Sequence, residues 1–194
     1  MTHVFYGKLE IRGYEIIMIF FTSDLHFCHV KIIPMCNRPF ADINEMHKVL
    51  IANWNAAVGK DDEVYILGDF LYKGQGQQAN RILCQLNGKK YLVKGNHERY
   101  LEDPDFDHSH YEWIKDYYEL PYKDTRFILF HFPILEWAHY WRKSVHLHGH
   151  NHCAVEPVSE YWGKRTFNVC ADLNNFTPIS ADAIYENVFG NNDN

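Results

Sequence analysis

One pattern constrains the fold of this chain more than any other: five short strand-like runs each end in a group of Asp, Asn or His residues. The runs are residues 16–21, 63–67, 91–94, 125–130 and 144–148. The first run is rich in Ile and breaks at Thr22-Ser23, which favours a buried strand over a piece of buried helix. The polar groups that follow the runs contain eight candidate ligand residues, which are Asp24, His26, Asp69, Asn96, His97, His131, His150 and His152.

Helical patterns lie between these runs. A capping box begins one helix at Asp42, and that helix is expected to continue to Gly59. A second helix is expected over residues 77–86, and Ser180 is placed to cap a last one. Strands that alternate with helices predict an α/β domain, in which ligands bind beyond the carboxyl ends of the strands. We therefore expect the polar groups to gather on one edge.

The length of 194 residues fits a single domain, here residues 1–194. Residues 1–15 carry no motif and are expected to be a peripheral extension, and residues 190–194 a frayed tail. Because Met18 opens the first strand, the sequence leaves open whether Met1 or Met18 is the natural start. No apolar run approaches the roughly 20 residues that span a bilayer, and no signal-peptide cleavage pattern follows the longest run. We expect a soluble, cytoplasmic protein without a membrane partner.

The charge balance bears on the class of partner. The net charge is −6, and the basic residues are scattered along the chain. This argues against an extended nucleic-acid footprint, which needs clustered positive charge, and leaves a small phosphorylated ligand as the expected partner.

The chemistry of the eight candidate ligands points to metal. Carboxylate, carboxamide and imidazole groups without thiolate suit divalent ions such as Mn, Fe, Zn or Ni. Eight ligands are too many for one ion, whereas two ions that share a bridging carboxylate would use them. In an extended chain Asp24 and His26 would point the same way and could meet at one ion. Taken singly, Asp24 and His26 fit a solvated loop, Asp69 and Asn96 fit turns, and His131 is the least specific of the set.

In this order, the motifs Asp24-x-His26, Gly68-Asp69, Gly95-Asn96-His97-Glu98, a lone His131 and Gly149-His150-x-His152 resemble the signature of the calcineurin-like metallophosphoesterases. The chain is similar to the small single-domain phosphoesterases of bacteria and phages, from about residue 18 to residue 184. The segments "NRPF" and "NVCADLNNFTP" also look like that group. The resemblance implies a sandwich of two sheets flanked by helices.

The resemblance also implies a role for each residue. The first metal would be held by Asp24, His26 and His152, with Asp69 as the bridge. The second metal would be held by Asn96, His131 and His150. By the same resemblance, His97 is not a ligand but faces the substrate and assists the leaving oxygen.

The implied activity is hydrolysis of a phosphodiester, with a nucleotide-type substrate, by a hydroxide that bridges two divalent metal ions, of which manganese is the first choice. A phosphomonoesterase or a dinucleoside-polyphosphate hydrolase on the same scaffold is the alternative. From a different class, a metal-bound interaction module without turnover also has to be considered. The sequence does not identify the substrate.

Three further residues are candidates for substrate contact. His29 lies where the small phosphoesterases carry a histidine, and it either touches the substrate or begins a helix. Arg38 and Arg99 are placed to hold phosphate oxygens through their guanidinium groups, with surface ion pairs as the alternative.

Two other patterns remain open. His146 and His148 alternate along a strand, so one face of it is polar; His148 could support a ligand from behind, with solvent exposure as the default. The aromatic clusters around residues 111–118 and 137–141 either stack a nucleobase or belong to the core and its rim, and packing is the favoured alternative.

Overall fold

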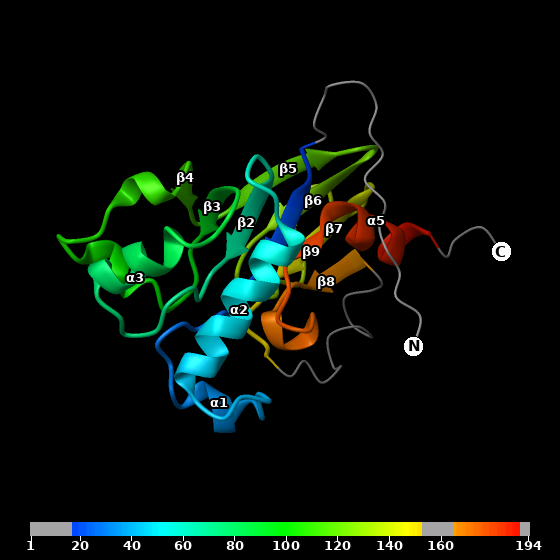
Figure 1. The fold of residues 1–194 in the computed structure, drawn as a ribbon. Helices are drawn as coiled ribbons and strands as arrows, with labels where there is room; N and C mark the ends of the chain where they lie inside the picture. Colours follow the sequence, from blue (N-terminus) through cyan, green and yellow to red (C-terminus); the bar gives the residue numbers. More distant parts are fainter. Residues whose placement is uncertain (1–16, 153–164, 191–194) are drawn as a thin grey trace, which may run out of the picture.

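The computed structural model describes residues 17–152 and 165–190, and in this part of the chain the strands form two sheets that pack face to face (Figure 1). The first sheet has the strand order β4-β3-β2-β1-β9 and the second the order β5-β6-β7-β8. In the first sheet the strands are β1 (Ile19–Thr22), β2 (Glu63–Leu67), β3 (Lys89–Val93), β4 (Trp113–Lys115) and β9 (Ile179–Ser180). In the second they are β5 (Tyr118–Tyr122), β6 (Thr125–Leu129), β7 (Ser144–His148) and β8 (Thr166–Asn168).

Parallel pairing places the strand ends that matter side by side. β1 pairs with β2 and β2 with β3 in parallel, and β6, β7 and β8 are parallel in the second sheet. β9 and β5 are the antiparallel members at one edge of each sheet. Because parallel strands run in the same direction, the polar residues that follow β1, β2 and β3 emerge at one edge of the first sheet.

The space between the two sheets is filled by apolar side chains from both. Phe21 of β1 is 0% exposed and its ring meets Tyr65 of β2 and Phe127 of β6, with ring centroids 5.6 and 5.4 Å away. The alternation of inward and outward residues along each strand explains this layer, because every second side chain faces the partner sheet.

The outer face of the first sheet is covered by helices. The longest is α2 (Ile43–Ala57), whose Asp42 side chain accepts hydrogen bonds from the backbone N–H groups of Asn44 and Glu45. Met46, Leu50 and Trp54 of this helix are buried at helical spacing. The other helices are α1 (Ile32–Met35), α3 (Gly76–Leu83) and α5 (Ala181–Phe189), and short 3-10 turns span Arg99–Glu102, His108–His110 and Ala171–Leu173.

Most of the expected elements are present, with differences at their ends. β2 and β7 have the expected bounds, whereas β1 begins at Ile19 because its pairing with β2 starts there. α3 ends at Leu83 and not at residue 86, since Gln85 and Leu86 donate to carbonyls three residues back and tighten the last turn. α5 is capped by Ser180 as expected. β4, β5, β8 and β9 were not expected.

The expected peripheral extension at residues 1–15 lies outside the described residues, and so do residues 191–194 of the tail expected at residues 190–194. Gly190 is described, and it caps the C-terminus of α5. Within residues 17–152 and 165–190, none of the helices combines the length and the apolar content that a membrane-spanning helix needs.

The contact between the sheets generates a prediction. Replacing Phe21 by Ala removes a ring that is 0% exposed and leaves a cavity between β1 and β6. We expect the free energy of unfolding, measured by urea denaturation, to fall by about 3–5 kcal/mol. The control is Met35→Ala, at a side chain that is 67% exposed, where a change below about 0.5 kcal/mol is expected. Equal losses in the two variants would contradict the inter-sheet core.

Candidate metal centre

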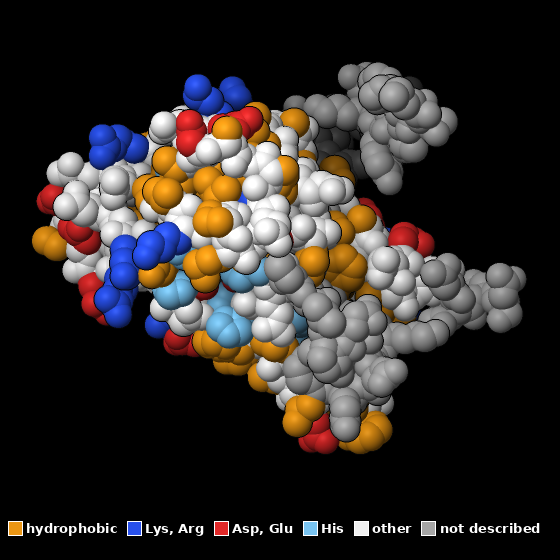
Figure 2. Space-filling view, turned by 90° about the horizontal axis from the view of Figure 1, so that it is seen from below, with side chains coloured by type: hydrophobic (Ala, Val, Ile, Leu, Met, Phe, Trp, Pro, Cys, Tyr) orange, Lys and Arg blue, Asp and Glu red, His pale blue; other side chains and the backbone are white. Residues whose placement is uncertain are grey.

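The polar groups that follow the parallel strands meet at one edge of the sandwich. Figure 2 shows a group of His side chains at the surface there, with Lys and Arg side chains beside it. Three sets of described side chains have ligand atoms that all lie within 4.8 Å of one another, and two of these sets contain Asp24. The first set is Asp24, His26 and His152, the second is Asp24, Asp69 and His131, and the third is Cys36, His152 and Asp172.

The backbone at these ligands is not extended, unlike the geometry first expected for Asp24 and His26. Their φ angles are 55° and 51°, and those of Asp69 and His150 are 55° and 71°. Residues other than glycine seldom adopt this left-handed region, and such strain concentrates at functional sites. The sharp turns after the strands, and not strand alternation, therefore aim these side chains at a common point.

Two glycines let the loops close around the carboxylates. A Cβ atom at Gly149 would lie 2.3 Å from Asp24 Oδ2, and one at Gly95 would lie 2.4 Å from Asp69 Oδ1. Neither distance is sterically possible, so only glycine permits this approach of the backbone to each carboxylate. Close packing against the two carboxylates thus explains why glycine precedes Asn96 and His150.

The first ligand set brings together two imidazoles and a carboxylate. His26 Nε2 and His152 Nε2 are 3.1 Å apart, and His152 Nε2 is 3.6 Å from Asp24 Oδ1. Burial, aided by the positive field of His152 and Arg38, lowers the pKa of His26 to about 2. His26 is therefore neutral, as an imidazole must be to bind a cation.

The second set is arranged around Asp69. Its Oδ2 lies 3.4 Å from His26 Nε2 and its Oδ1 lies 3.7 Å from His131 Nε2, so the two oxygens face different ligand sets. His131 donates a hydrogen bond from Nδ1 to the carbonyl oxygen of Leu67 at 2.7 Å. Its Nε2 atom therefore carries the lone pair that can bind a metal ion, and this atom lies 3.1 Å from Asn96 Oδ1. This placement suits a bridging carboxylate.

His150 and His97 lie at the border of the site. The His150 ring meets those of His131 and Phe132, at centroid distances of 5.2 and 4.8 Å, and its backbone N–H donates to Asp24. His97 Nε2 lies 3.9 Å from Asp69 Oδ2, and 35% of its side chain is exposed. Both predicted residues are thus at the site, and neither belongs to the three closely spaced sets that the described residues form.

The buried charge at the site fits a cation. Asp24 and Asp69 are 0% and 2% exposed, and burial raises the pKa of Asp69. Among residues 17–152 and 165–190, the side chains that form ion pairs with either carboxylate are histidines, and no Lys or Arg does so. Buried carboxylates need a compensating charge, which a divalent metal ion held by these oxygen and nitrogen donors would supply.

Arg38 corrects one expectation. Its side chain is 0% exposed and forms an ion pair with Asp172 at 2.7 Å. The remaining N–H groups donate to the carbonyl oxygens of Asp24 and Leu25. Arg38 is therefore bound within the protein, where it fixes the turn that carries Asp24, and it does not extend to a substrate as the sequence suggested.

Asp172 is a functional residue that the sequence analysis missed. Its carboxylate accepts from Arg38 and from His152 Nδ1, the latter at 2.8 Å, and thereby directs His152 Nε2 toward the first ligand set. Although burial opposes ionisation, the hydrogen bonds from His152 and Arg38 lower the pKa of Asp172 to about 2. The only signal in the sequence was its place in the closing block "NVCADLNNFTP".

Glu98 ties two ligand loops together. Its two carboxylate oxygens accept from the backbone N–H groups of Phe70 and Gly95, at 3.0 and 2.8 Å. Burial and the nearby charge of Asp69 raise the pKa of Glu98 to about 7. Because Phe70 follows Asp69 and Gly95 precedes Asn96, this one side chain sets the distance between those ligands.

The other sequence candidates divide between the interior and the surface. His29 is buried, with Nδ1 3.4 Å from His26 Nδ1 and its ring stacked on Tyr72 at a centroid distance of 3.7 Å. Arg99 is exposed and lines a cavity of about 400 Å³ that Asn96 also lines, so it remains a candidate for substrate contact. The default of solvent exposure for His146 and His148 is wrong, because both are buried.

The comparisons with known proteins agree with this geometry. The family model of the calcineurin-like phosphoesterase matches residues 17–154. An uncharacterized protein of Methanocaldococcus jannaschii is 33% identical over 171 residues, which are 86% of this chain and 88% of that protein. The gene 66 protein of Mycobacterium phage D29 is 29% identical over 163 residues, covering 71% of this chain and 79% of that protein.

A solved structure supports the fold. A protein of unknown function from Aquifex aeolicus has a TM-score of 0.71 and 26% identity, covering 87% of this chain and 98% of that chain. The chain belongs to the calcineurin-like phosphoesterase family, and the expected α/β fold of two sheets flanked by helices is confirmed. As a member of this family it is a metal-dependent phosphoesterase.

The buried ion pair behind His152 generates a prediction. Replacing Arg38 by Met leaves the carboxylate of Asp172 buried without its cation, and we expect unfolding free energy to fall by about 3–5 kcal/mol in urea denaturation. Arg126→Met is the matched control, because the Arg126 side chain is 39% exposed in its ion pair with Glu119. That control should cost about 1 kcal/mol or less. A similar small loss for Arg38→Met would show that its ion pair is dispensable.

Proposed function

We propose that the chain hydrolyses a phosphodiester, with a nucleotide-type substrate, at a centre for two divalent metal ions. The observation that carries this proposal is the position of Asp69, whose Oδ2 faces His26 and whose Oδ1 faces His131. A carboxylate with one oxygen toward each ligand set is what two neighbouring ions would share.

The proposed ligand roles build on the two sets that contain Asp24. The first set, Asp24, His26 and His152, would hold one ion. His131 of the second set, together with Asn96 and His150 beside it, would hold the other ion, with Asp69 between them. When bound, two such ions lower the pKa of a shared water and offset the charge on the phosphoryl oxygens. Manganese is the first ion we propose, with Fe, Zn or Ni as the alternatives, because all four suit oxygen and imidazole nitrogen donors without thiolate.

His97 is the residue that we propose assists the leaving group. Its Nε2 faces the ligand cluster, and its partly exposed ring can reach an oxygen of a bound substrate. From this position a proton on the ring can pass to the leaving oxygen as the ester bond breaks. The position of His97 beside the ligands also argues against an interaction module without turnover, because such a module would not need a proton donor there.

The surroundings of Asn96 support a substrate larger than a simple phosphate ester. The cavity of about 400 Å³ beside it is lined by Lys94, Arg99 and His108 among others. Arg99 offers a guanidinium group to the part of the substrate that extends beyond the reacting phosphate, whereas Lys94 is paired with Asp116 and the cavity is also lined by Glu98 and Glu102. The size of the cavity and Arg99 favour a nucleotide-type diester, and they would also serve a dinucleoside polyphosphate, which is the second candidate.

Activity measurements test the assignment. We expect hydrolysis of bis(p-nitrophenyl) phosphate that is abolished by a chelator and restored by Mn²⁺, with little turnover of p-nitrophenyl phosphate. Asp69→Asn should abolish the activity, and His97→Ala should lower kcat by roughly 10²–10⁴-fold. Asp61→Asn, at an exposed acid before β2, is the control and should leave kcat unchanged. Full activity of the Asp69 variant would refute the bridge, and a preference for the monoester would refute the diester assignment.

Tyr72 holds His97 in place, and the sequence analysis did not single it out. Its ring stands at 75° to that of His97 with centroids 4.9 Å apart, and it also contacts the stacked ring of His29 and the ring of His26. Edge-to-face contacts of this kind fix the orientation of both rings.

This contact predicts a dependence on the leaving group. In Tyr72→Leu, kcat should fall by about tenfold for a diester with a poorly leaving alkoxide, because a displaced His97 no longer delivers its proton. For the p-nitrophenyl diester, whose leaving group needs little protonation, the loss should be much smaller. Tyr72→Phe keeps the ring and should match the unmodified protein. Equal losses on both substrates would indicate a general structural effect instead.

A further inference from the structure

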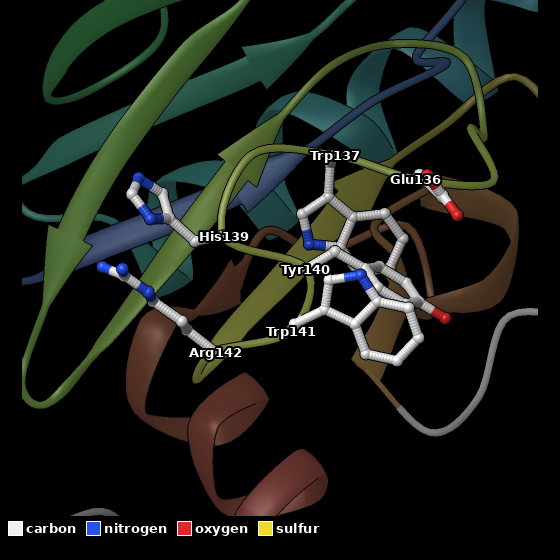
Figure 3. A pocket seen from close by; sticks show the side chains of 6 residues that line it. All are labelled: Glu136, Trp137, His139, Tyr140, Trp141 and Arg142. Carbon is white, nitrogen blue, oxygen red and sulfur yellow. The ribbon is translucent and has the colours of Figure 1, made fainter.

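A second pocket lies on the segment that joins β6 to β7, outside the ligand sets described above. Its volume is about 390 Å³, and it is lined by Glu136, Trp137, His139, Tyr140, Trp141 and Arg142. The three aromatic rings gather on one side of it, and the side chains of His139 and Arg142 extend on the other (Figure 3).

The aromatic rings of the pocket differ in exposure: Trp137 is anchored in the protein, and Trp141 faces solvent. Trp137 is 8% exposed, and its Nε1 donates to Ser144 Oγ at 3.0 Å. Tyr140 packs against Trp137 at 76° with centroids 4.7 Å apart. Trp141 stands at 87° to Tyr140 and is 85% exposed. An indole of this exposure, held beside anchored rings, offers a flat surface on which a planar aromatic ligand can stack.

Two arginine side chains, Arg142 and Arg165, lie near the aromatic rings of the pocket. The guanidinium of Arg165 lies 5.4 Å from the centroid of Tyr140, and Arg165 also donates to the carbonyl oxygen of Arg142. Among residues 17–152 and 165–190, no carboxylate forms an ion pair with Arg142 or with Arg165. Guanidinium groups that carboxylates do not neutralise are suited to phosphate, which they can bind through two N–H groups.

We propose that this pocket is a nucleotide-binding site, in which the base stacks on Trp141 and Tyr140 and a phosphate is held by Arg142. A planar base alone would use the rings, and a phosphate alone would use the guanidinium. A ligand that joins both at a short distance uses both, and a mononucleotide has this chemistry.

The pocket is connected to the metal centre through the same segment. His131 opens the segment, and Phe132 contacts the rings of His131 and His150. Farther along the segment, Trp137 packs against His146 of β7, with ring centroids 5.2 Å apart. The nucleotide could therefore be the remote part of a substrate that reacts at the metal centre, or a separate molecule. The binding chemistry is the same for both sources.

Calorimetric titration of the full chain with AMP in the presence of a chelator tests the site without any contribution from metal or turnover. We expect AMP to bind, and ribose 5-phosphate, which lacks the base, to bind at least about tenfold more weakly. Absence of heat with millimolar AMP would overturn the proposal while leaving the metal-dependent activity as it stands.

Variants locate the binding to this pocket. Trp141→Ala removes an exposed ring, so the fold should be unchanged, and the Kd for AMP should rise by about tenfold or more. Arg142→Ala should weaken AMP but not adenosine. Tyr117→Ala, at another exposed aromatic residue outside the pocket, is the matched control and should leave the Kd unchanged. Equal affinity in Trp141→Ala and the control would also overturn the proposal.

Kinetics then separate the two sources of nucleotide. If the pocket holds part of the substrate, Trp141→Ala raises KM for a dinucleotide and leaves KM for bis(p-nitrophenyl) phosphate unchanged. If it holds a separate molecule, KM for both substrates is unchanged in Trp141→Ala, and AMP still binds to Asp69→Asn. Both results support a nucleotide site. The link to substrate rests on the proposed diesterase activity, whereas the binding experiment does not.

Discussion

Two buried carboxylates without a Lys or Arg partner are the constraint around which this molecule is organised. Asp24 and Asp69 follow adjacent parallel strands, and the described side chains that form ion pairs with them are those of histidines. Imidazoles that bind a metal must be in their neutral form and then do not offset the charge of the two carboxylates, so the site needs a cation to balance it. The uncompensated charge of Asp24 and Asp69 favours the binding of cations. The same residues also have strained backbone conformations, so two destabilising features coincide at this site.

Behind the ligands lies a layer of polar contacts that holds them in position. Asp172 orients His152 and is itself fixed by Arg38, while Glu98 connects the loops that carry Asp69 and Asn96. These residues touch the ligands or the adjoining backbone, and each has both oxygens or most of its N–H groups in use. Because the ligand geometry depends on them, a change in this layer would alter metal affinity as well as stability.

Some of this was predictable from the sequence because it depends on local patterns. Apolar runs that end in Gly-Asp or Gly-Asn-His reveal both the strand and the edge at which its ligands emerge, and Asp42 reveals the start of α2. Contacts between distant segments were not predictable. Arg38 resembled a surface cation because nothing near it in the sequence shows that Asp172 would bury it. His146 and His148 followed the alternation of an exposed strand face, but in the fold Trp137 packs on His146 and the His146 ring stacks on that of His148. The short strands β4 and β9 lack a long apolar run, and their pairing with neighbours defines them.

The ion pair between Arg38 and Asp172 joins positions 134 residues apart. The ligand that Asp172 orients is therefore in place only when these two distant segments are packed together, which links metal binding to the folding of the domain. A bound divalent ion would raise the free energy of unfolding, because the unfolded chain does not hold the ligands together.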